Sequence, residues 1–118
     1  MTESHVIETD IFKLFPGDSS VPLQVQVTTK SSATTNDGFI PYGTSVSSVT
    51  GKIYKLEDNT DVTTDIMEGS PTESDNIITT YLNYPTTNGV GNYSLVLIIT
   101  LNTGSTLQIN VPLIKVYE

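Results

Sequence analysis

The sequence predicts an all-β sandwich, built as a single domain over residues 1–118 from seven to eight antiparallel strands. Val and Ile supply 22 residues and Thr and Ser supply 31, whereas Ala33 is the only alanine. Since β-branched side chains favour strands and alanine is the best helix former, this composition favours sheets over helices. Turn signals recur about every ten residues, a spacing typical of sandwiches and small barrels.

Two strands are expected before the first long loop. Val6–Phe15 is the first, and it ends at Pro16–Asp18, where proline fixes φ and the following glycine is free to take positive φ. Val21–Thr29 is the second, because apolar residues occupy every second position from Leu23 to Val27. Pro22 near its start indicates an entry or edge position, where a missing amide is tolerated.

Lys30–Thr44 reads as a long loop that turns at Asn36–Gly38. Three large side chains lie within it: Phe39, Ile40 and Tyr42. Loops of this length are usually tied to the body of the domain, so we expect these side chains to anchor the loop to the core. The alternative is that they line a contact surface.

The second half of the chain supplies the remaining strands. The polar segment after Met67, with its glycine and proline, is expected to be a loop, and Asn102–Ser105 a hairpin turn. Pro112 implies a bulge or an edge in the last strand. The expected strands are Val46–Leu56, Asp61–Met67, Ile77–Tyr84, Tyr93–Leu101 and Leu107–Tyr117.

The charge of the chain limits its partners. The formal net charge is −8, with five lysines, no arginine and thirteen carboxylates. Binding of nucleic acid requires a cationic surface that displaces counterions from phosphates, and an anionic protein is repelled by anionic membranes. We therefore expect neither nucleic acid nor a membrane as a partner.

Cysteine is absent, so disulfides, thiolate nucleophiles and zinc-ribbon sites are excluded. The segment Met1–Phe12 lacks the basic and apolar regions of a secretory signal peptide. The longest apolar run, Leu95–Ile99, is far shorter than the ~18 residues of a membrane span. If Met1 is the natural start, we expect the protein to be made and folded in a cytoplasm.

Candidate chemistry is sparse. A Ser-His-Asp triad would depend on His5, the only histidine, whose place in the first five residues favours a solvated side chain. The sequence contains no nucleophile elbow, phosphate loop or H-E-x-x-H zinc motif. We therefore expect a protein that is not an enzyme and that binds no cofactor.

A carboxylate-rich segment and several tyrosines are the remaining candidates for a binding site. The preferred interpretation is that the segment forms a solvated acidic rim. One alternative is that it supplies oxygen ligands for calcium. Another is that two of its carboxylates form the catalytic pair of a glycosidase. No metal site is expected. The tyrosines can stack on sugars in a carbohydrate-binding module, although strand tyrosines more often pack in cores. The carboxylates are Glu57, Asp58, Asp61, Asp65, Glu68, Glu73 and Asp75, and the tyrosines are Tyr42, Tyr54, Tyr81, Tyr84 and Tyr117.

The run Gly91-Asn92-Tyr93-Ser94-Leu95 resembles the tyrosine corner of immunoglobulin-like sandwiches, in which a tyrosine opens the penultimate strand and its hydroxyl bonds to nearby backbone. In this interpretation Gly91 lets the chain cross where a side chain would clash, and Tyr93 buries its ring. The resemblance implies an immunoglobulin-like sandwich. The chain departs from antibody domains because it contains no tryptophan and no cysteine pair.

The strand that follows has apolar residues on both faces. Alternation places Leu95, Leu97 and Ile99 towards the core, so Val96 and Ile98 take the opposite face. That face is either partly covered by a loop or lysine stems, or it is a contact with a partner or a second subunit. Ile114 and Val116 could extend such a contact if the hairpin register permits.

A narrower resemblance involves the segment D-V-T-x-x-I-M-x-G-S-P-T at Asp61–Thr72, together with G-x-Y-x-L at Gly91–Leu95. These segments resemble small immunoglobulin-like proteins encoded among tailed-bacteriophage structural genes. The resemblance implies a non-enzymatic virion accessory protein (capsid-decoration, neck or tail-associated) that contacts other virion proteins or itself. It also implies assembly in the host bacterial cytoplasm. The alternative is a carbohydrate- or protein-binding surface module.

Overall fold

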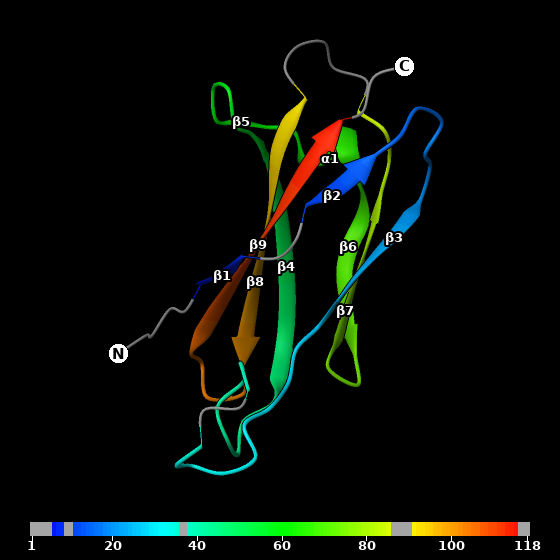
Figure 1. Ribbon diagram of the computed structural model, residues 1–118. Coiled ribbons are helices and arrows are strands. Elements are labelled where there is room, and N and C mark those ends of the chain that lie inside the picture. The colour runs from blue at the N-terminus through cyan, green and yellow to red at the C-terminus, as the bar shows by residue number, and fades with distance from the viewer. Residues whose placement is uncertain (1–5, 9–10, 36–37, 86–90, 116–118) are drawn as a thin grey trace.

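The computed structural model describes residues 6–8, 11–35, 38–85 and 91–115, and within them the fold is all-β, as predicted. In these described ranges, nine strands form two sheets that face each other, and a four-residue helix lies between two of the strands in the sequence (Figure 1). The elements are β1 (Val6–Glu8), β2 (Phe12–Leu14), β3 (Val21–Gln26), β4 (Val46–Lys55), β5 (Thr60–Asp61), α1 (Thr63–Ile66), β6 (Met67–Ser74), β7 (Ile77–Leu82), β8 (Asn92–Leu101) and β9 (Thr106–Lys115).

The strands divide unequally between the sheets. The large sheet has the order β1-β9-β8-β4-β5, with β2 also paired to β9, and the small sheet has the order β3-β7-β6. The chain therefore leaves the large sheet after β5, crosses through α1 to the small sheet, and returns at β8. Strands adjacent in sequence are not always adjacent in space, since β3 and β4 lie in different sheets.

The expectation that all strands are antiparallel is wrong for the start of the chain. β1 and β2 run parallel to β9, with Val6 opposite Gln108 and Phe12 opposite Leu113. The single strand expected over Val6–Phe15 is therefore two short strands along one edge. The pattern of apolar residues fixes which face of a strand is buried, but it does not fix the partner or its direction.

Pro112 lies inside β9 without a shift in the β8–β9 register, where it is opposite Ser94. Because Lys115 donates its amide to the Gly91 carbonyl next to β8, antiparallel alternation turns the Pro112 nitrogen towards β1 and β2. On that side of β9, Asn110 is the last residue paired to β1 and Leu113 is the first residue paired to β2, and Pro112 lies between them. The missing amide therefore removes no ladder bond, so Pro112 needs neither the bulge nor the edge strand that the sequence implied.

The core lies between the sheets and comes mainly from the β8–β9 hairpin. Every second residue of these two strands is buried, which confirms the predicted alternation. Fully buried aliphatic side chains of this kind each stabilise a domain by roughly 1.5–3 kcal/mol. The buried residues of the hairpin are Tyr93, Leu95, Leu97, Ile99, Leu101, Leu107, Ile109, Val111 and Leu113.

The segment after Asp61 differs from the prediction. The expected strand Asp61–Met67 is instead the end of β5, the helix α1 and the first residue of β6, and the expected loop after Met67 is strand β6. Met67 and Pro71 are buried, and the register shifts between Glu68 and Thr72. The shifted segment contains Gly69, which has φ 75°. β6 is an edge strand of the small sheet, and proline is tolerated in such a strand at Pro71.

The long loop is anchored as expected by two of its three large side chains. Ile40 is fully buried, Phe39 packs against the core, and Tyr42 is exposed. Backbone bonds tie the same segment to the chain beyond β3, since Thr28 accepts from the amides of Phe39 and Ile40 at 2.8 and 2.9 Å. Residues 36 and 37 of the predicted turn lie outside the described residues.

The two sheets approach closely at Gly51 in β4. A Cβ atom at this position would lie 2.9 Å from Met67 Cε and 2.9 Å from Pro71 Cγ, both from β6. It would also lie 3.3 Å from Cδ2 of Leu97. Glycine within a strand often marks such a close approach. The absence of a side chain at Gly51 therefore makes room for the two core residues of β6.

Candidate functional site

The carboxylate-rich segment supplies the largest group of ionisable side chains, and three of its members stabilise backbone turns. Asp61 Oδ1 accepts from the Thr63 hydroxyl at 2.5 Å and from the Thr63 amide at 2.9 Å. Asp58 Oδ1 binds Thr60 in the same way, at 2.6 and 3.1 Å. Each pair is an aspartate two residues before a threonine, the spacing of an Asx-turn.

Two other members act elsewhere in the fold. Glu73 accepts from the Asn76 amide at 2.9 Å, where β6 turns into β7. Glu68 accepts a hydrogen bond from the Ser20 hydroxyl, and the Ser20 amide in turn donates to Asn83 Oδ1. Three of these four carboxylates therefore support local turns, and Glu68 makes a contact to a residue that is distant in the sequence.

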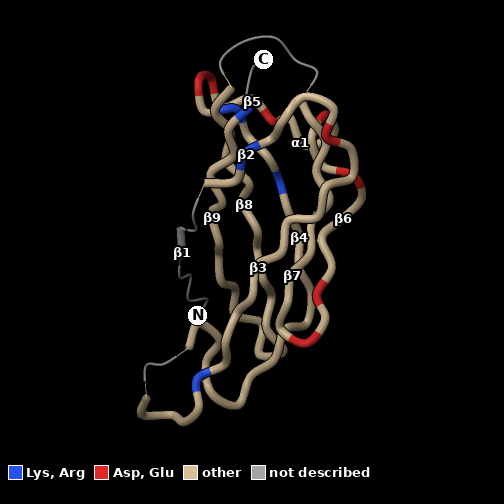
Figure 2. The backbone as a smooth tube through the Cα atoms, turned by 45° about the vertical axis from the view of Figure 1, so that its right-hand side comes forward, with Lys and Arg blue, Asp and Glu red and all other residues tan. Residues whose placement is uncertain are grey.

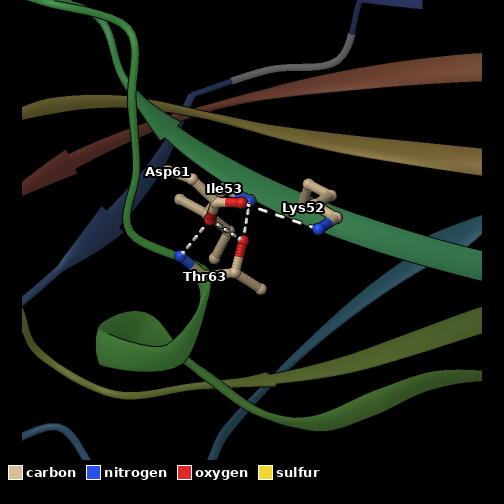
Figure 3. A network of polar contacts seen from close by, with 4 residues as sticks. All are labelled: Lys52, Ile53, Asp61 and Thr63. Atoms are coloured by element: carbon tan, nitrogen blue, oxygen red, sulfur yellow. Dashed lines mark hydrogen bonds and ion pairs between the residues drawn. The ribbon is translucent and has the colours of Figure 1, made fainter.

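Figure 3 shows how Asp61 links β4 to the crossover. The Thr63 hydroxyl that donates to Asp61 also accepts from the Ile53 amide at 2.9 Å. Lys52 Nζ lies 3.6 Å from Asp61 Oδ2, but both side chains are largely exposed, so this ion pair contributes little. The hydrogen bonds rather than the ion pair position the chain where it leaves the large sheet.

These contacts lower the pKa of both aspartates. The Thr63 hydroxyl, and then its amide, hold the pKa of Asp61 below the ordinary value of 3.8, because they bond preferentially to the ionised carboxylate. The Thr60 hydroxyl and amide lower the pKa of Asp58 in the same way. Both effects belong to structural turns.

We expect the Asp61→Asn variant to be less stable than the wild type at neutral pH. A lowered pKa in the folded state means that the ionised carboxylate stabilises the fold fully above the unfolded pKa of 3.8, and that this stabilisation is lost as the pH falls through the folded value. The difference in unfolding free energy between the two proteins should therefore shrink below about pH 4. Urea denaturation between pH 7 and pH 2 measures it, and a difference that does not change with pH would contradict the proposed bonds.

Calcium has no candidate cluster within the described part of the chain, where no three carboxylate, histidine or cysteine side chains converge. His5 lies outside the described residues. In the same described ranges, no helix combines the length and the apolar character needed to cross a membrane.

The two residues of the proposed tyrosine corner lie at the start of β8. Tyr93 is the second residue of this strand and is 1% exposed. A Cβ atom at Gly91 would lie 2.8 Å from Lys115 Cβ and 3.0 Å from its carbonyl oxygen, so a side chain would clash there. The hydrogen bond is not found, since the buried Tyr93 hydroxyl has no partner within the described residues. The tyrosine corner itself therefore stays a prediction.

The possible contact face at Val96 and Ile98 is set among polar side chains. Both residues are half-buried on the outer face of the large sheet. Val96 is opposite Lys52 and Asn110, and Ile98 is opposite Thr50 and Gln108, in β4 and β9 respectively. These neighbours confine the apolar surface of the face to a narrow strip.

The register does not join Ile114 to this strip. Ile114 is opposite Asn92, and the Ser94–Pro112 pair separates it from Val96. A hollow of about 290 Å³ lies at this pair, and the exposed side chain of Leu56 is part of its lining. Val116, the other residue that could extend the face if the register permitted, lies outside the described residues.

The tyrosines that the structure describes do not form one stacking surface. Tyr54 lies on the outer face of the large sheet, opposite Ser94, whereas Tyr81 lies on the outer face of the small sheet. Tyr84 is half-buried, with Lys115 Nζ 5.4 Å from its ring centre. Tyr42 projects from the long loop, and Tyr117 is outside the described residues. These four described tyrosines therefore offer no shared platform for a sugar.

We did not predict the recess at Gly51 from the sequence, although an isolated glycine within a strand could have indicated it. The edge position of β3 agrees with the entry or edge position that Pro22 indicated. No local signal showed that β1 and β2 pair with β9 rather than with β3. Comparison of the chain with protein-family models, with curated proteins and with solved structures finds no significant match.

Proposed function

We propose that this chain is a non-enzymatic structural or interaction module with an immunoglobulin-like sandwich fold. The observation that carries the proposal is the strand order. In immunoglobulin-like sandwiches the second, fifth and fourth strands form one sheet and the third, sixth and seventh form the other. With β1 and β2 taken together as a first strand and β5 as an added edge, β3-β7-β6 and β9-β8-β4 have this order.

The use of the carboxylates supports a structural role. Asp58, Asp61 and Glu73 accept hydrogen bonds from residues two or three positions later in the chain and so build turns. A catalytic pair would instead need two carboxylates facing each other across a cleft. The hydrogen bonds of these carboxylates stabilise turns of the fold, which supports a structural role for them.

The biological setting proposed is a bacteriophage virion, in which the protein is an accessory of the capsid, neck or tail and is assembled in the host bacterial cytoplasm. The resemblance of Asp61–Thr72 and Gly91–Leu95 to proteins encoded among tailed-phage structural genes supports it. The partners would be other virion proteins or further copies of the chain. A protein-binding surface module is the second candidate, favoured by the exposed apolar side chains of Ile11 and Phe15.

Mass spectrometry of purified particles from the source tests this proposal. We expect the protein at a fixed number of copies per particle, retained through density-gradient purification. Its absence from particles would overturn the virion assignment. Binding to an array of glycans or to a host surface protein would then favour the second candidate.

Self-association through the Val96–Ile98 strip is a separate prediction. We expect light scattering of the wild type to show a mass that grows with concentration and with salt, because salt screens the repulsion between copies of charge −8. The Val96→Ser/Ile98→Ser variant should stay monomeric and folded, and Thr50→Ser is the matched control on the same face. A wild type that is monomeric at all salt concentrations would contradict this prediction.

A further inference from the structure

The strand β3 has an open side. It lies at the edge of the small sheet, with β7 as its neighbour and no strand on its other side among the described residues. Val27 donates its amide to the Asn76 carbonyl at 2.8 Å, next to β7. Since antiparallel strands alternate between inward and outward backbone groups, Leu23 and Val25 also bond to β7, whereas Gln24 and Gln26 direct their amides and carbonyls outward.

This open side is short because both of its ends are closed. Pro22, the previous outward residue, has no amide to donate. Beyond Val27, the Thr28 carbonyl accepts from the amides of Phe39 and Ile40, and Lys30 donates to the Ile40 carbonyl at 2.8 Å. The backbone groups of Gln24 and Gln26 remain, and we call them the β3 window.

An apolar hollow lies beside the window. Its volume is about 360 Å³, and its lining includes Ile11 and Phe12 from the β2 region, Leu23 and Val25 from β3, and Val111 from β9. Ile11 is 56% exposed. A segment that pairs with the window can therefore place an apolar side chain against this lining.

The other long edge of the small sheet is protected in a different way. β6 carries Glu68 and Glu73 and has a shifted register, and charges and bulges of this kind discourage strand pairing. Figure 2 shows acidic positions along β6, whereas β3 carries no charged residue. In the large sheet, the strands β5, β1 and β2 have only two or three residues each, and β4 has no strand on its β5 side before Tyr54 among the described residues.

We propose that the β3 window binds an extended peptide segment of another protein, which adds as a strand to the small sheet. Free backbone donors and acceptors at one strand edge are matched by an extended backbone, and the hollow selects an apolar side chain. The net charge of −8 favours a neutral or basic segment. This inference goes beyond the proposed function, since it holds whether or not the protein is part of a virion.

A second copy of the chain fits the window poorly. If two β3 strands pair about Gln24, each Gln26 meets the Pro22 of the other copy, which lacks a donor. If they pair about Val25, Pro22 of one copy meets Thr28 of the other, whose carbonyl is already engaged by Phe39 and Ile40. Repulsion between two chains of charge −8 opposes either arrangement.

The test uses random octapeptides on beads as the probe and the full chain as the bait. We expect enriched peptides to alternate apolar and polar residues and to carry net positive charge. A selected peptide should shift the amide NMR signals of Gln24 and Gln26 and slow their hydrogen exchange. No enrichment over beads without the protein, or shifts that map to Val96 and Ile98 instead, would overturn the proposal.

Two variants isolate the window. Gln24→Pro removes the outward amide but no bond to β7, so the protein should fold and lose affinity about tenfold, which corresponds to one hydrogen bond. Gln24→Thr keeps the amide and should bind like the wild type. Ile11→Lys replaces an exposed apolar side chain of the hollow by a charged one and should also weaken peptide binding. This second variant tests the proposal even if Gln24→Pro does not fold. Unchanged binding by folded Gln24→Pro would contradict the proposal. So would self-association in light scattering that Gln24→Pro abolishes and Val96→Ser/Ile98→Ser does not.

Discussion

Replacing Gly51 with valine is expected to lower the free energy of unfolding by about 1–3 kcal/mol, the usual cost of an overfilled core. The first added carbon would already lie 2.9 Å from both Met67 Cε and Pro71 Cγ. The methionine side chain can move aside, but the proline ring is held by its own backbone in β6. The two sheets would therefore have to separate locally or distort.

Two comparisons make this result specific to the recess. Thr50→Val places the same valine side chain at the neighbouring residue of β4, which lies on the outer face, and should change stability by less than about 0.5 kcal/mol. Met67→Ala should cost less in the Gly51→Val background than in the wild type, because it vacates the same space. Equal stability of Gly51→Val and wild type in urea denaturation would show that the sheets are not packed together at this position.

Substitutions at Tyr93 are expected to separate the role of its ring from that of its hydroxyl. Tyr93→Ala removes a core aromatic side chain and should lower the free energy of unfolding by about 3–5 kcal/mol. Tyr93→Phe removes only a buried hydroxyl that has no partner among the described residues, so stability should be unchanged or should rise by up to about 1 kcal/mol.

The Tyr93→Phe result also decides the tyrosine corner. A corner of that kind requires a hydrogen bond from the hydroxyl to backbone, and its loss would lower the free energy of unfolding by roughly 1–2 kcal/mol. The denaturant midpoints of wild type and Tyr93→Phe, measured side by side, give the sign of the difference. A loss in that range would contradict the unpartnered hydroxyl and support the corner.

The strands that the sequence predicted well are those whose two faces differ in chemistry. In β3, Leu23 and Val25 face the core between glutamines. The β8–β9 hairpin repeats the alternation of burial, although the outer face of β8 carries the apolar residues Val96 and Ile98. In β6, only Met67 and Pro71 are buried, and the rest of the strand is polar. Such a strand looks like a loop because its stability comes from its neighbour β7 and from the recess at Gly51 in the facing sheet.

The partners of strands were harder to predict than the strands. Nothing in the residues Val6–Leu14 distinguishes pairing with β9 from pairing with β3, because either partner can bury the same side chains. The aspartate turns are different. Asp58 and Asp61 each precede a threonine by two residues, so their roles could have been inferred locally from Asx-turn chemistry.

The pairing of β1 and β2 with β9 leaves β3 open, and the β3 window depends on this pairing. Amide hydrogen exchange along β3, followed by NMR on the isotopically labelled protein, tests this arrangement most directly. The structure predicts slow exchange at Leu23 and Val25, which bond to β7, and much faster exchange at Gln24 and Gln26, whose amides face outward. Equal protection of all four amides would show that β3 has a second neighbour and would contradict the account.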